Sequence, residues 1–268
     1  MDIKDLVIYR NLEHQELFRD IAHLMGYAQG GQEPDGASCG GRLAELAVKY
    51  GFEGNLWHCF LAFCLANNEN AYTTTCEITG PAGGSLDELA REDCRIFKVL
   101  FDYDIRNLEP SGLWALMENY KPARKDSRVF NRRVRNRIVN LAVQLEESAD
   151  AGQFQDHVVE FYREFGVGKF GLNKAFRIIE KEEGQPVIID PIINVEHINF
   201  KDIVGYELQK QKLIENTEAF VDGKEANNVL LFGDAGTGKS SSVKAVLNEY
   251  YARGLRIIEV YKHQFKAL

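Results

Sequence analysis

The residues best suited to chemistry lie near the C-terminal end of the sequence, in the segment GDAGTGKSS. Its members are Gly233, Asp234, Ala235, Gly236, Thr237, Gly238, Lys239, Ser240 and Ser241. The first eight fit the spacing GxxxxGK[ST], in which a glycine-rich loop lets consecutive backbone N–H groups converge on phosphate oxygens. The spacing predicts a phosphate-binding loop.

Two side chains of this loop have distinct predicted roles. Lys239 supplies a positive charge for the β- and γ-phosphates, and Ser240 supplies a hydroxyl that can ligate Mg²⁺. A helix that begins at the loop adds N–H groups and the positive end of its dipole, which also favour an anion. We therefore predict that the chain binds a nucleoside triphosphate together with Mg²⁺.

The flanking residues predict the elements that would hold the loop. An apolar run, residues 228–232, leads into the loop and predicts a β-strand. A helix is expected to follow the loop and to stop at Gly254, and residues 256–261 predict a second strand. Strand, loop, helix and strand in this order indicate the opening of an α/β domain with a parallel sheet.

Hydrolysis needs more than this loop, because Mg²⁺ is also held by an acidic residue at the end of a later strand. No apolar run ending in paired carboxylates follows the loop before Leu268, and Asp190, which ends an apolar run, precedes it. Residues 199–268 make up about half of an ordinary domain. We expect a fragment of a longer protein, without sustained nucleotide turnover and with exposed apolar strand edges.

The region ahead of this domain is expected to be helical, with residues 28–41 as a glycine-rich loop. The chain has 45% hydrophobic residues, no apolar run that approaches the roughly 18 residues of a membrane span, and no signal-peptide pattern. Five cysteines lack metal-site spacing and are expected to be free thiols, including Cys59 beside His58. We expect a cytoplasmic protein without a membrane partner.

A basic segment, residues 121–137, is the one local candidate for a nucleic-acid contact in a chain of net charge −8. It predicts an amphipathic helix on which Arg128, Arg132 and Arg135 share a face. That face could contact nucleic acid or an acidic partner, or it could be a solvated surface paired with acidic neighbours. The second interpretation is favoured.

The C-terminal quarter of the chain resembles the AAA+ ATPases. The resemblance rests on NFKDIVGYE (residues 199–207), a helix to Phe220, NNVLLFGDAGTGKSS and RIIEVYKHQF. The segment is most similar to bacterial predicted AAA-type ATPases that are described only as a domain of unknown function. Helices ahead of the ATPase core are also typical of that group.

This resemblance implies further roles for particular residues. Ile203, Val204 and Gly205 match the segment that lies against the adenine base, which makes ATP the implied nucleotide. AAA+ proteins typically form homo-oligomeric rings and hydrolyse ATP with an arginine from a neighbouring subunit. The positions that would carry the acidic residue of the later strand and this arginine are absent from this sequence. The resemblance therefore implies ring assembly and catalysis only for a longer protein.

These observations define one preferred interpretation. The expected fold is α + α/β, with a helical N-terminal region (1–183), an extended linker (184–198) and an incomplete P-loop NTPase core of the AAA+ kind (199–268). The expected function is ATP binding within an ATPase that remodels an unknown protein partner. The alternatives are a small-molecule kinase with a P-loop, and a non-enzymatic helical adaptor that binds nucleotide.

Overall fold

The computed structural model describes residues 2–123, 132–180 and 187–266. The chain forms two compact units, Met1–Leu172 and Asn173–Leu268, which we call the helical unit and the sheet unit. This division lies earlier than the expected boundary after residue 183. The reason is that a strand, β1 (Ala175–Ile179), pairs with strands of the sheet unit.

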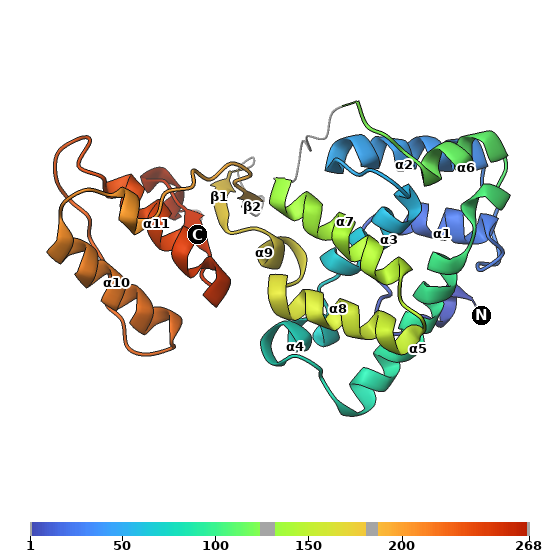
Figure 1. The fold of residues 1–268 in the computed structure, drawn as a ribbon, viewed down its shortest axis with the longest axis horizontal. Helices are drawn as coiled ribbons and strands as arrows, with labels where there is room; N and C mark the ends of the chain where they lie inside the picture. The colour runs from blue at the N-terminus through green and yellow to red at the C-terminus, as the bar shows by residue number, and fades with distance from the viewer. Residues whose placement is uncertain (1, 124–131, 181–186, 267–268) are drawn as a thin grey trace. The chain divides into compact units, whose positions relative to one another are not determined.

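The helical unit is built around one apolar helix, α3 (Leu56–Asn67) (Figure 1). Every residue of this helix from Leu56 to Ala66 is buried. Helix α7 packs against α3, and α8 packs against α4 and α5. The remaining helices of the unit are α1 (Gln15–Leu24), α2 (Gly36–Tyr50), α4 (Ala71–Thr79), α5 (Gly84–Asp102), α6 (Ser111–Glu118), α7 (Arg132–Glu146), α8 (Ala151–Phe165) and α9 (Gly168–Leu172). Across the described ranges, no helix combines the length and the apolar character that a membrane span requires.

Helix α2 begins inside the segment 28–41 that was expected to be a loop. Asp35 caps it by accepting hydrogen bonds from the N–H groups of Ala37 and Ser38. A Cβ at Gly36 would lie 2.0 Å from the Glu109 carbonyl oxygen, so a glycine is required there. The glycines allow close helix packing in this place, which a local pattern of turn residues cannot distinguish from a loop.

The sheet unit contains three short strands in the order β2-β1-β3. Strand β2 (Ile188–Pro191) is antiparallel to β1, and β3 (Ile257–Glu259) is parallel to it. The expected linker 184–198 therefore contains a paired strand, and its Asp190 lies opposite Arg177. The mixed helical chain with this small sheet agrees with the broad α + α/β expectation.

Two helices, α10 (Glu207–Val221) and α11 (Lys239–Tyr250), complete the sheet unit (Figure 1). Helix α11 begins directly after the loop, as the sequence predicts, but it ends at Tyr250 and not at Gly254. Gly254, with φ 94°, ends the 3-10 turn that follows, Tyr251–Arg253. A buried cluster of Phe200, Ala245, Val246 and Tyr250 joins α11 to the segment that precedes α10.

The expected strand at residues 228–232 does not form. This segment has no ladder partner within the described chain, and Leu230 and Phe232 are 82% and 86% exposed. Asn216 fixes its beginning, because the Asn216 amide exchanges two hydrogen bonds of 2.8 Å with the backbone of Asn227. The apolar side chains of this segment are exposed, but they do not form the apolar strand edge that the sequence predicts.

Candidate nucleotide-binding site

The backbone of the phosphate loop curves tightly because three of its glycines adopt positive φ. Gly233, Gly236 and Gly238 have φ of 137°, 80° and 84°, values that residues with a side chain rarely adopt. Gly238 is the N-cap of α11, so the chain passes directly from the loop into the helix. This backbone places the loop at the N-terminal end of α11, where N–H groups lack intrahelical partners.

The Lys239 ammonium lies inside the loop. Its Nζ donates hydrogen bonds to the carbonyl oxygens of Gly233 at 2.9 Å and Asp234 at 2.6 Å. The Thr237 hydroxyl donates to the same Asp234 oxygen at 2.9 Å. A positive charge is thus already centred in the loop, where phosphate oxygens would need it.

The serines after Lys239 differ in their surroundings. Ser240 is exposed in the first turn of α11, and its hydroxyl makes no hydrogen bond with the described residues. Ser242 donates its hydroxyl to the Gly238 carbonyl at 2.9 Å and so belongs to the helix itself. A free hydroxyl at Ser240 fits Mg²⁺, which takes few protein oxygens and completes its shell with water and phosphate oxygens.

A pocket of about 460 Å³ joins the loop to the segment that the resemblance assigns to adenine. Its lining consists of Ile198, Asp202, Ile203, Val204, Tyr206, Ala235, Gly236, Thr237, Gly238 and Ser241. Two of the three predicted base contacts, Ile203 and Val204, thus share a pocket with the loop. The third, Gly205, shapes the turn beside it with φ 82°.

Three side chains that the sequence analysis did not single out hold this segment in place. Lys210 donates from Nζ to the Ile203 carbonyl at 2.8 Å, and Glu249 accepts from the Phe200 N–H at 2.8 Å. Asn248 donates to the carbonyls of Glu196 and Ile198 at 2.9 and 2.8 Å. No local sequence signal marks these residues, because each contact depends on how α10 and α11 pack.

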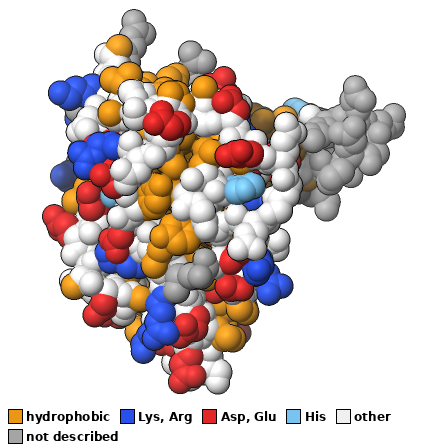
Figure 2. Space-filling model, turned by 90° about the vertical axis from the view of Figure 1, so that its right-hand side faces the viewer, with side chains coloured by type: hydrophobic (Ala, Val, Ile, Leu, Met, Phe, Trp, Pro, Cys, Tyr) orange, Lys and Arg blue, Asp and Glu red, His pale blue; other side chains and the backbone are white. Residues whose placement is uncertain are grey.

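The structure does not place Arg132 and Arg135 on the single exposed basic face that the sequence predicts. Arg128 lies outside the described residues, and Arg132 is exposed at the start of α7. Arg135 is buried: its Nε donates to the Gly51 carbonyl at 2.7 Å and its Nη2 lies 2.6 Å from a Glu53 carboxylate oxygen. Figure 2 shows one face of the helical unit, on which basic and acidic side chains are interspersed.

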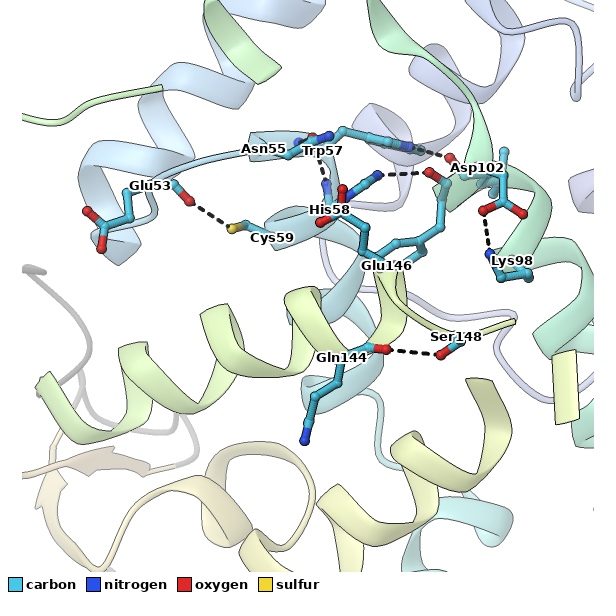
Figure 3. A network of polar contacts seen from close by, with 12 residues as sticks. Glu53, Asn55, Trp57, His58, Cys59, Lys98, Asp102, Gln144, Glu146 and Ser148 are labelled. Carbon is cyan, nitrogen blue, oxygen red and sulfur yellow. Dashed lines mark hydrogen bonds and ion pairs between the residues drawn. The ribbon is translucent and has the colours of Figure 1, made fainter. Parts of the chain in front are cut away.

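The His58–Cys59 pair belongs to a polar network within the helical core (Figure 3). His58 Nε2 makes a 2.8 Å hydrogen bond with the Phe101 carbonyl, and Cys59 donates its thiol to the Glu53 carbonyl. Burial raises the pKa of the Cys59 thiol to about 12, so the thiol is protonated at neutral pH. Within the residues that the structure describes, no group of three or more metal-ligating side chains occurs.

Comparisons with known proteins find similarity to a family model and to a curated relative. A family model described as "Protein of unknown function (DUF815)" matches residues 172–268, which span the whole sheet unit and the last residue of the helical unit. The Replication factor C large subunit of Staphylothermus marinus is 36% identical over 76 residues, which cover 28% of this chain and 17% of that protein. No solved structure gives a significant match. The two matches suggest a relative of AAA+ ATPases.

Proposed function

We propose that the protein binds ATP with Mg²⁺ in the pocket between the phosphate loop and the segment 203–205. The triphosphate would lie on the loop, with Lys239 against its β- and γ-phosphates and Ser240 on the metal. The adenine would lie against Ile203 and Val204. The observation that carries the proposal is that one pocket is lined by both segments, although about 30 residues separate them.

The chemistry of the lining supports this arrangement. Thr237 and Gly238 belong to the loop end of the pocket, where backbone donors and the helix dipole favour anions. Ile203 and Val204 give the other end an apolar surface of the kind that packs against a base. A pocket of about 460 Å³ lies within the usual range of roughly 300–1,000 Å³ for small-molecule sites.

We further propose that the site serves an AAA-type ATPase, in which Mg²⁺-dependent ATP hydrolysis and ring assembly drive the remodelling of an unknown protein partner. In such enzymes an acidic residue completes the Mg²⁺ site beside the phosphate loop.

The first test measures ATP binding by isothermal titration calorimetry in Mg²⁺ buffer, with wild type and Lys239→Ala. Two charge-assisted hydrogen bonds are worth about 3–5 kcal/mol, so affinity should fall at least about hundred-fold. Lys224→Ala is the control, because Lys224 is exposed and its ion pair among the described residues is with the exposed Asp222. Equal ATP affinity in wild type and Lys239→Ala would exclude the proposed site.

A further inference from the structure

Lys210 is the charged side chain most closely tied to the proposed base contact. It projects from the first turn of α10 and is only 12% exposed. Its Nζ lies 2.8 Å from the Ile203 carbonyl oxygen and 2.7 Å from a Glu207 carboxylate oxygen. Glu207 is 79% exposed, so solvent screens its carboxylate and its pairing with Lys210 contributes little to stability. The carbonyl of Ile203 is therefore the partner that gives this ammonium its place.

The turn before α10 brings these groups together. Gly205 and Tyr206 adopt successive left-handed conformations, with φ of 82° and 58°. The chain reverses there, so that Lys210 reaches back to a residue that lies seven positions earlier. A left-handed tyrosine costs about 1–2 kcal/mol, which indicates that the surrounding contacts hold this turn.

The hydrogen bond leaves Ile203 and Val204 in different states. The Ile203 N–H donates to the Phe200 carbonyl at 3.2 Å and its carbonyl accepts from Lys210, so both backbone groups of Ile203 are fixed. Val204 is 93% exposed, and its backbone N–H and carbonyl make no hydrogen bond with the described residues. The fixed backbone of Ile203 thus holds the next residue, Val204, at the pocket with its N–H and carbonyl available to a ligand.

We infer that Lys210 is a positioning residue for base recognition: its bond to Ile203 holds the backbone of Val204 in place against the base. This inference rests on the proposed function. It assigns Lys210 to the base end of the pocket, whereas Lys239 serves the phosphate end. Loss of Lys210 should therefore weaken the binding of a nucleotide while leaving the binding of a bare polyphosphate intact.

The test compares two probes, ATP and inorganic tripolyphosphate, by calorimetry in Mg²⁺ buffer. Lys210→Met keeps the length and helix propensity of the side chain but removes the charged donor. It should weaken ATP binding about ten-fold or more and leave tripolyphosphate affinity within about two-fold of wild type. Lys210→Arg retains a donor and should restore most of the loss. Lys212→Met, on an exposed position of the same helix, is the matched control.

The outcomes separate the two claims. Equal ATP affinity in wild type and Lys210→Met would overturn the positioning role. Equal loss for ATP and tripolyphosphate would also overturn it, because a general effect on the unit would then explain the change. Lys239→Ala should weaken both probes. If wild type binds neither probe, the proposed function fails and the inference fails with it.

Discussion

Asn248 offers the sharpest test of how the sheet unit holds its pocket. From α11, its Nδ2 donates to the carbonyls of Glu196 and Ile198, and its Oδ1 accepts from Lys174 Nζ. The side chain therefore joins α11 to the chain that leads into the pocket and to the residue before β1. Asn248→Asp changes one atom position from a donor to an acceptor and leaves the shape nearly unchanged.

The expected cost follows from these contacts. The substitution removes two donated hydrogen bonds, each worth about 1 kcal/mol net, and places a carboxylate oxygen against two carbonyl oxygens. The Lys174 contact is retained and offsets part of this loss. Because Asn248 is half-buried, we expect the local opening free energy to fall by about 2–4 kcal/mol. Opening should then become about thirty- to eight-hundred-fold more frequent.

Hydrogen–deuterium exchange with peptide resolution measures this change. Peptides from α11 should exchange faster in Asn248→Asp than in wild type. Trp57 and Trp114 both lie in the helical unit, so their fluorescence reports that unit alone and should not change. Gln209→Glu introduces the same charge at an exposed position of α10 and serves as the control.

Two results would refute the reasoning. Wild-type exchange rates in the α11 peptides of Asn248→Asp would mean that these hydrogen bonds contribute no net stability. Equal acceleration in Asn248→Asp and Gln209→Glu would mean that added negative charge, rather than the lost donor, causes the effect.

Two further predictions concern the helical unit, and urea unfolding followed by tryptophan fluorescence checks both. Asp93 is fully buried and accepts hydrogen bonds from the backbone N–H groups of residues 7–9. Asp93→Ala should therefore lower the free energy of unfolding by about 3–5 kcal/mol, and a loss under about 1 kcal/mol would contradict this. Burial lowers the pKa of His58 against the opposing effect of Glu146, so the unfolded chain binds a proton that the folded chain resists. The free energy of unfolding should fall as pH drops below about 6.5, and His58→Phe should make it depend less on pH in that range. The same pH dependence in wild type and His58→Phe would exclude His58 as its source.

The features that the sequence predicts correctly are those set by local chemistry. Helix α11 begins at Lys239, directly after its glycine-rich loop. Helix α10 and strand β3 also form where their local patterns place them. Short-range signals of this kind need no knowledge of distant partners.

The features that the sequence does not reveal depend on distant residues. Strand β1 was expected to belong to the helical region and β2 to a linker. Strand β2 forms by pairing with β1, and β1 forms by pairing with both β2 and β3. Residues 228–232 have a strong strand pattern but find no partner within the described chain. The roles of Lys210 and Asn248 likewise arise from packing, which single-residue propensities do not contain.

The buried cluster of the sheet unit has a consequence for how a ligand would act on it. Phe200, Ala245, Val246 and Tyr250 form this cluster, and Ile203, which lines the pocket, packs against it. The wall of the pocket is thus in direct contact with the core of the sheet unit. Ligand binding in the pocket and folding of the sheet unit are therefore linked equilibria. A ligand at about one hundred times its Kd would add about 2.7 kcal/mol to the unit's stability. A bound ligand would in this sense also be a component of the fold.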